Sequence, residues 1–415
     1  MSRKTVEKRW IETSANIRRI CRTGVTTAIV GSLLACAAAP DPYPQDQPGT
    51  GLETVTNAQP STTAQAVPDR PLPPALQRSS SRWIPVRWAD LPGWGQDRLH
   101  EAWNAWLKGC ERPTATGMPG QAKLCNEVRQ LSIGTSEAQH AWLMQRFQPY
   151  RVTAADGSLP PGLLTGYYEP ILPASRLRSA RHQVPLYAPP PGLTPGGMPW
   201  FNRQQIDTLP AAKAALQGCV LAWLEDPLDA LMLHIQGSGR LQMTEPDGTQ
   251  RTVRMAFAGH NGHPYRSVAR WLLDQGAVRE GTWEAVRTWA RKNPSRINEM
   301  LWANPRTVFF REEPLSELDA RFGPRGAQGV PLTPGRSIAV DPQAIPYGTP
   351  VWLVTQGPTL NEQRLVLAQD TGSAIVGAAR ADYFTGWGHF SDSVYTTAAA
   401  LKQSLQLWVL WPLTD

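Results

Sequence analysis

Three aspartates near the C-terminal end of the chain each follow or adjoin a short apolar run. Asp341 ends the run SIAVD, Asp370 ends the run LVLAQD, and Asp382 lies in the segment RADYFTGWG. The end of a strand is a position from which a rigid sheet can hold a carboxyl group towards a cleft, where it can act as a general acid or base. Asp341 and Asp370 also have a plainer interpretation, because both stand where an aspartate commonly begins a turn.

Asp382 differs from the other two in its neighbours, which include Tyr383, Phe384 and Trp387. An apolar wall disfavours the charged form of a carboxyl group and raises its pKa. A carboxyl group that stays protonated near neutral pH can serve as a general acid. The sequence therefore indicates Asp382 as the candidate proton donor.

Other motifs that could carry chemistry are weaker. The segment GSGR at 237–240 lacks the Lys-Ser/Thr pair of a nucleotide phosphate loop, so a hairpin or the edge of a cleft is the better interpretation. His260 and His263 have no evident third ligand, and the sequence contains no CxxC pair. There is no GxSxG motif for a serine nucleophile. We expect neither a metal site nor a cofactor.

Apolar spacing predicts the elements that would position these residues. Three- and four-residue spacing predicts helices at 97–106, 136–147, 265–275 and 283–292. Short apolar runs predict strands at 229–236, 250–257, 337–340, 350–354, 364–368 and 405–410, with a turn at 246–248. The fold class is therefore mainly β with peripheral helices. Because few helices are long enough for crossovers between parallel strands, a closed or nearly closed barrel is favoured.

The N-terminus has the features of an export signal. A basic stretch precedes an apolar run at 24–36 that is about 13 residues long, too short to span a bilayer. Its last residues, LLAC, resemble the lipobox of bacterial lipoproteins, which implies a signal peptide at 1–35 and a lipid on Cys36. Ala37 follows instead of Asp, which implies an outer-membrane location facing the periplasm. The segment 36–75 is rich in proline and poor in large apolar residues, so we expect a tether.

The remaining cysteines fit an exported protein. Cys110 and Cys125 are close in sequence, and an oxidising compartment favours a disulfide between them. Cys219 is better explained as a small buried apolar residue than as a nucleophile.

The charge balance argues against a nucleic-acid partner. The net charge is +7, but seven Lys and Arg against two Glu in the first 35 residues account for most of the excess. A nucleic-acid-binding protein usually carries a dense basic patch on its folded part. The rest of the chain carries a net charge of only 7 − 5 = +2, which is weak for a body of this size.

Six motifs, in this order along the chain, resemble those of the membrane-bound lytic murein transglycosylase A family. They are LTGYYEP at 164–170, LHIQGSGR at 233–240, GHNGHPYRS at 259–267, GVPLTPGRS at 329–337, VDPQAIPYGT at 340–349 and AQDTGSAI at 368–375. The resemblance covers about residues 80–411. One departure is Ser373, which stands where the family commonly has a second glycine.

The resemblance implies a double-psi β-barrel formed by 76–170 and 306–415, and a second β-domain inserted at 171–305, with a groove between them. It also implies that Asp382 is the single catalytic acid/base and that Asp370 and Asp341 are its companions. The groove residues that it implies are Thr165, Gly166, Tyr168, Glu169, Gln236, Ser238, Gly239, Tyr265 and Arg266.

The activity implied is cleavage of the β-1,4 bond between N-acetylmuramic acid and N-acetylglucosamine in peptidoglycan, with formation of 1,6-anhydro ends. The expected partners are glycan strands, the membrane through the lipid, and proteins that build or remodel the wall. Two alternatives stay open: a hydrolase on the same barrel that uses water and two carboxylates, and a non-catalytic wall-binding lipoprotein.

Overall fold

The computed structural model describes residues 70–113, 117–194 and 196–413. The predicted signal peptide, the lipidation site at Cys36 and most of the predicted tether lie outside the described residues. Within them, no helix is both long enough and apolar enough to cross a membrane.

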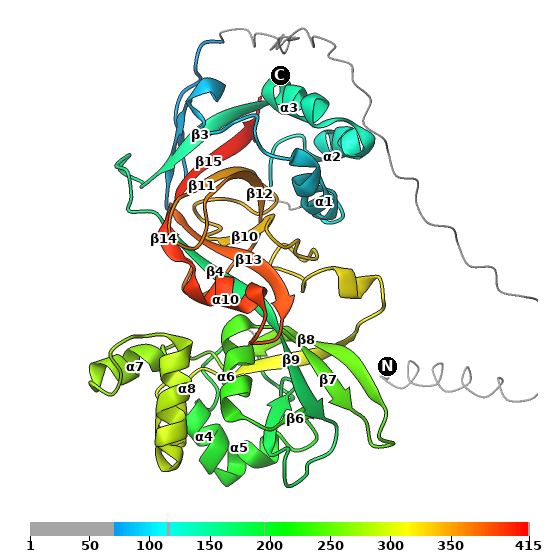
Figure 1. The fold of residues 1–415 in the computed structure, drawn as a ribbon, viewed down its shortest axis with the longest axis vertical. Helices are drawn as coiled ribbons and strands as arrows, with labels where there is room; N and C mark the ends of the chain where they lie inside the picture. Colours follow the sequence, from blue (N-terminus) through cyan, green and yellow to red (C-terminus); the bar gives the residue numbers. More distant parts are fainter. Residues whose placement is uncertain (1–69, 114–116, 195, 414–415) are drawn as a thin grey trace, which may run out of the picture. The chain divides into compact units, whose positions relative to one another are not determined.

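The strands form two sheets that share β4 (Leu163–Ser175), as Figure 1 shows. The first sheet follows the order β1-β2-β3-β15-β11-β12-β10-β13-β4, and β14 pairs with β4. Its other strands are β1 (Leu76–Gln77), β2 (Arg82–Pro85), β3 (Phe147–Thr153), β10 (Ser337–Val340), β11 (Pro350–Thr355), β12 (Glu362–Asp370), β13 (Arg380–Gly388), β14 (Lys402–Ser404) and β15 (Gln406–Pro412). This confirms the expected mainly β fold class.

The chain at 402–412 joins the two ends of this sheet. β14 pairs with β4 from Lys402 to Ser404, and β15 pairs with β11 from Gln406 to Val409. The pairings β11-β12-β10-β13-β4 therefore return to their start through one continuous segment. Val340, Val366 and Leu407 are among the buried residues that the ring encloses. Such a ring leaves few free edges and gives the strand ends a rigid frame.

The second sheet continues from the outer half of β4. It adds β5 (Val184–Tyr187), β6 (Val220–Leu224), β7 (Gly239–Thr244), β8 (Gln250–His260) and β9 (Val308–Pro314). The helices of this part are α4 (Arg203–Thr208), α5 (Pro210–Ala215), α6 (Pro227–Gln236), α7 (Val268–Asp274), α8 (Trp283–Lys292) and α9 (Ile297–Trp302). The predicted helix at 283–292 and the predicted strand at 250–257 are thereby confirmed.

The prediction of a strand at 229–236 was wrong, because this segment lies in α6. Asp226 caps the helix by accepting a hydrogen bond from the Leu228 amide, Pro227 occupies the first turn, and Gly237 ends the helix at φ +79°. These start and stop signals are those of a helix. The apolar run is continuous because α6 is buried against both β4 and its neighbouring helices, and such a run hides helical periodicity.

Helices α1 (Leu99–Gly109), α2 (Gln121–Gln130) and α3 (Ser136–Arg146) cover one side of the first sheet, and α10 (Ser393–Ala400) packs against β4 and β13. The predictions at 97–106 and 136–147 are confirmed within a few residues. Among the described residues, four short 3-10 turns complete the elements, at Trp88–Asp90, Leu131–Ile133, Pro294–Arg296 and Asp319–Arg321.

A disulfide joins Cys110, at the end of α1, to Cys125 in α2. Both cysteines are buried in the cluster that holds Trp103 and Trp106. We expect the variant with Cys110→Ser and Cys125→Ser to lose about 3 kcal/mol of unfolding free energy, the value expected for a closed loop of roughly 15 residues. Denaturant titration would measure this loss, and a variant as stable as the wild type would contradict it.

Candidate active site

Two of the three predicted aspartates lie at the same level of the first sheet. β10 runs between β12 and β13, and its residue Ala339 is opposite both Asp370 and Asp382. Residues directly opposite one another in a sheet project to the same face. The two carboxyl groups are therefore separated by a single strand and share one face of the first sheet.

The hydroxyl of Thr165 on β4 donates a hydrogen bond of 2.7 Å to Asp382 Oδ1. Thr165 is the register partner of Asp382 in the parallel pair of β4 and β13, so the backbone itself sets this contact. Burial raises the pKa of Asp382, while the Thr165 hydrogen bond and the positive charge of Arg380 lower it in part. The environment thus favours a protonated carboxyl group that can donate its proton.

Asp370 is more firmly held than Asp382. Its Oδ2 accepts a hydrogen bond of 2.9 Å from the Tyr167 hydroxyl, and its Oδ1 accepts one of 2.9 Å from the Ala327 amide. Burial raises the pKa of Asp370 to about 6, although hydrogen bonds from the Thr371 backbone, Ala327 and Tyr167 lower it, and the negative charge of Asp382 adds to the rise. The environment of Asp370 therefore favours its protonated form more than that of an exposed aspartate does, beside the candidate acid.

Asp341 has a different environment. It is 7% exposed and accepts hydrogen bonds from the amides of Gln343 and Gly377, both 2.9 Å, and from the Ser80 hydroxyl at 3.1 Å. These contacts fix the turn after β10 and the segment that leads into β13. We therefore expect Asp341 to position the Asp382 strand rather than to touch a substrate.

The aromatic wall expected around Asp382 is only partly present. Phe384 is buried and its ring centre lies 5.3 Å from that of Tyr167, whereas the Tyr383 hydroxyl donates to the Gly335 carbonyl and Trp387 lies under the Arg240 guanidinium. Successive residues of a strand point to opposite faces, so neighbours in sequence do not all surround Asp382.

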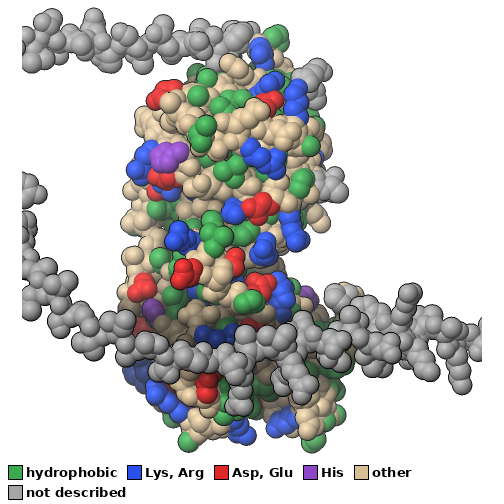
Figure 2. Space-filling model, turned by 90° about the vertical axis from the view of Figure 1, so that its right-hand side faces the viewer, with side chains coloured by type: hydrophobic (Ala, Val, Ile, Leu, Met, Phe, Trp, Pro, Cys, Tyr) green, Lys and Arg blue, Asp and Glu red, His purple; other side chains and the backbone are tan. Residues whose placement is uncertain are grey.

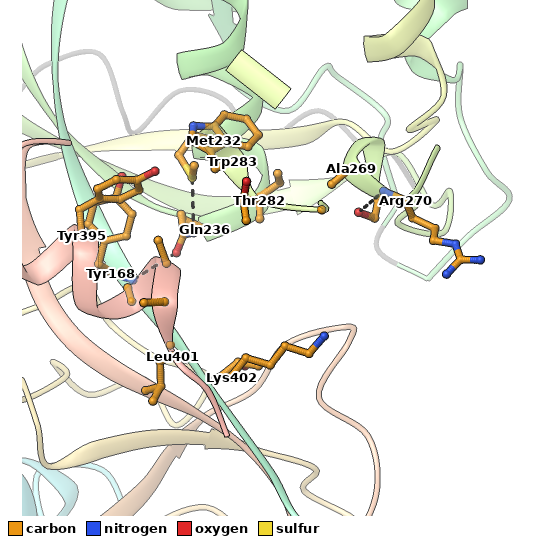
Figure 3. Close-up of a pocket in the computed structure, with 18 of the residues that line it drawn as sticks. Tyr168, Met232, Gln236, Ala269, Arg270, Thr282, Trp283, Tyr395, Leu401 and Lys402 are labelled. Atoms are coloured by element: carbon orange, nitrogen blue, oxygen red, sulfur yellow. Dashed lines mark hydrogen bonds between the residues drawn. The ribbon is translucent and has the colours of Figure 1, made fainter. Parts of the chain in front are cut away.

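A cavity of about 850 Å³ adjoins this site and is drawn in Figure 3. Five of the predicted groove residues line it: Thr165, Gly166, Tyr168, Gln236 and Tyr265. Neither Asp370 nor Asp382 is among the lining residues, and Thr165 connects the cavity to Asp382 through its hydroxyl.

Four predicted groove residues do not line this cavity. Glu169 is fully buried, with Oε2 2.8 Å from Arg240 Nε and Oε1 2.6 Å from Arg254 Nε, so its carboxylate already has two charged partners. Ser238 and Gly239 are buried as well, and a Cβ on Gly239 would clash with Leu233. Arg266 is exposed outside the cavity.

The sequence does not predict that Tyr167 would hold Asp370 or that Arg240 would pair with Glu169. In each case the partners are far apart along the chain, by 203 and 71 residues. One sequence feature does point to the contact with Asp370. Thr165 and Tyr167 are two residues apart, so on a strand their side chains lie on the same face of β4.

Replacing Thr165 with Val should move the basic limb of the pH–rate profile to higher pH. The hydroxyl donates to the carboxylate form of Asp382, so its loss raises the pKa of Asp382 further, by up to about one pH unit. Measuring kcat/KM for the cleavage reaction expected from the sequence, from about pH 4 to 9, roughly the range in which carboxyl groups with raised pKa values titrate, would test this. Thr194→Val, at an exposed loop position, is the control, and a basic limb that stays in place or moves down would contradict the expectation.

Lys and Arg side chains are interspersed with Asp and Glu over the face shown in Figure 2, without a continuous basic patch there. This distribution agrees with the weak net charge expected for the folded part of the chain.

Comparison with known proteins places this arrangement in a family. The model described as the MltA specific insert domain matches residues 163–311, and the model described as the 3D domain matches residues 336–411. A lytic transglycosylase of Burkholderia pseudomallei, LtgG, is 41% identical with a TM-score of 0.54, covering 82% of this chain and 98% of that one. MltA from Neisseria gonorrhoeae is 29% identical with a TM-score of 0.67, covering 83% of this chain and 96% of that one.

Among curated relatives, membrane-bound lytic murein transglycosylase A of Escherichia coli (strain K12) is 32% identical over 225 residues. The match covers 51% of this chain and 56% of the relative, so the chain spans about half the length of that protein. Together, the two matched domains and the extended likeness to LtgG show that the chain belongs to the MltA family of lytic murein transglycosylases.

Proposed function

We propose that the chain is a peptidoglycan lytic transglycosylase that cleaves the β-1,4 bond between N-acetylmuramic acid and N-acetylglucosamine. The observation that carries the proposal is the partly buried Asp382, whose pKa is raised by burial and whose Oδ1 is held by Thr165. A carboxyl group in this state can protonate a leaving oxygen.

In the proposed reaction, protonated Asp382 donates its proton to the glycosidic oxygen as the bond from C1 to that oxygen breaks. The resulting carboxylate then takes the proton of the muramic acid C6 hydroxyl, whose oxygen forms a new bond to C1. The product is a 1,6-anhydro end, and Asp382 returns to its protonated form. One carboxyl group can serve both steps because it is an acid first and a base afterwards.

Asp370 supports this reaction as a neighbouring charge. Both of its oxygens already accept hydrogen bonds, from Tyr167 and Ala327, which hold the carboxylate in one orientation. In the alternative, a hydrolase, Asp370 would have to activate a water molecule.

Digestion of purified murein with the full chain, followed by mass analysis of the products, tests the proposal. Anhydro products are lighter than hydrolytic products by about 18 Da, the mass of one water. Anhydro ends are the expected result. Reducing ends would replace the proposal with a hydrolase, and binding without any release would favour a wall-binding lipoprotein.

We further propose that residues 76–170 and 306–415 form the catalytic domain and that 171–305 are inserted into it. β4 supports this division, because its last pair with β13 is Pro170 with Gly388 and its first pair with β7 is Ile171 with Arg240. The strand therefore passes from one sheet to the other at this point, as Figure 1 shows.

We also propose that a lipid on Cys36 anchors the protein to the outer membrane, facing the periplasm. The relatives named membrane-bound support an association with a membrane. Cys36→Ala should move the protein from the membrane fraction to the soluble fraction of cells, which immunoblotting would detect. Ser32→Ala, inside the same apolar run, is the control, and a Cys36 variant that stays with the membrane would contradict lipid anchoring.

A further inference from the structure

The cavity is lined on β4 by Thr165, whose hydroxyl donates to Asp382, and by Gly166 and Tyr168. Tyr168 packs with Tyr395 and Met232 on the cavity side, whereas Thr165 and Tyr167 donate to Asp382 and Asp370. A Cβ on Gly166 would meet α10, which places this residue on the cavity side as well. The cavity is therefore adjacent to the candidate acid but does not contain it.

The lining of the cavity is aromatic and apolar, with positive charge and no carboxylate. Its aromatic residues are Tyr168, Tyr265, Trp283 and Tyr395, and none of the lining residues is Asp or Glu. Two cations, Arg270 and Lys402, lie away from the tyrosine end in Figure 3. Arg270 is 2.8 Å from Asp274, while exposed Lys402 has no ion pair with any residue that the structure describes.

Hydrogen-bond donors add to this character. The N-terminal end of α8, a helix of 10 residues, contributes Thr282 and Trp283 to the lining, and a helix N-terminus favours negative charge. Glu284 in the first turn is 3.0 Å from Arg291 and does not line the cavity. Tyr168 Oη and Trp283 Nε1 are buried beside the cavity without a hydrogen-bond partner among the described residues.

These features suit a ligand with an apolar body and carboxylates. A cavity of about 850 Å³ is within the range of sites for small organic ligands. In murein, each muramic acid carries a short peptide with carboxylates, joined through a lactyl ether to C3 of the sugar. The bond that Asp382 would break is at C1 of that same sugar, so the peptide leaves the ring close to the candidate acid.

We propose that this cavity binds the carboxylate-bearing stem peptide of the muramic acid whose bond is cleaved, with Lys402 as the principal charged contact. This inference rests on the proposed function and adds to it a preference for peptide-bearing strands.

The first test compares murein strands that carry stem peptides with strands from which an amidase has removed them. Lys402→Met should raise KM for peptide-bearing strands about tenfold, the loss expected for a charge-assisted hydrogen bond, while kcat stays unchanged. Its activity on peptide-free strands should equal that of the wild type. Lys292→Met, an exposed lysine at the other end of α8, is the matched control. Equal losses on both substrates, or no loss on either, would overturn the proposal.

The second test does not depend on cleavage. The Asp382→Asn protein is titrated by calorimetry with free stem peptide and with the same peptide after its carboxylates have been amidated. Binding of the free peptide that is weakened by amidation and by Lys402→Met supports the cavity assignment. Absence of such binding, in a protein whose wild-type form still yields anhydro ends, would overturn this inference and leave the proposed function in place. Peptide binding without anhydro ends would do the reverse.

Discussion

Asp382→Asn should reduce kcat for murein digestion at least about 10³-fold, because the amide cannot donate the proton that the leaving oxygen requires. Asn has nearly the same shape and can still accept the hydrogen bond from Thr165 through its carbonyl oxygen. The loss would therefore report the chemistry of the carboxyl group rather than a rearranged site. Single-turnover rates and mass analysis of the products would measure it.

The fold of this variant should be unchanged or slightly more stable at neutral pH. The pKa of Asp382 is raised in the folded protein, so its ionised form opposes folding above the pKa of the unfolded chain. The protonated form of Asp370 likewise stabilises the folded state. This contribution to the free energy of unfolding is fully present below about pH 3.8 and is lost as the pH rises to about 6. Asp156→Asn, in an exposed turn, is the control. An Asp382→Asn protein that keeps more than about a tenth of the activity would exclude Asp382 as the acid.

Glu169→Gln should destabilise the protein by about 3–5 kcal/mol, the cost of leaving a buried charge without its partner. Arg240 and Arg254 both donate to this carboxylate, and both also donate to the Phe322 carbonyl at 2.8 Å. The Arg240 guanidinium lies 4.1 Å from the centre of the Trp387 ring on β13. The cluster therefore connects β4, the second sheet, the segment between β9 and β10, and the strand of Asp382.

Thermal unfolding would measure this effect, with an expected fall in the midpoint of about 10 °C for a domain of this size. Glu317→Gln removes the same charge from an exposed position between β9 and β10 and should leave the midpoint unchanged. A Glu169→Gln protein as stable as the wild type would show that the two arginines do not depend on the carboxylate.

Local sequence patterns are sufficient to predict a helix or strand that is amphipathic or has clear end signals. The helix at 283–292 is predicted to the residue, because it buries one face and begins at a Thr cap. The strands around Asp341 and Asp370 are predicted as well, since short apolar runs end there. The helix at 229–236 is not predicted correctly, because a helix buried on several sides has the same continuous apolar run as a buried strand.

The sequence by itself determined the mainly β fold class and, through ordered motifs, the family to which the chain belongs. It also indicated which aspartates adjoin the strands of the first sheet. Only the tertiary structure decided which groups face them: Thr165 is 217 residues from Asp382, and Glu169 is withdrawn from the cavity by two arginines. The physical reason is that pKa values and burial depend on neighbours brought together by strand pairing, and a local sequence pattern does not contain those neighbours.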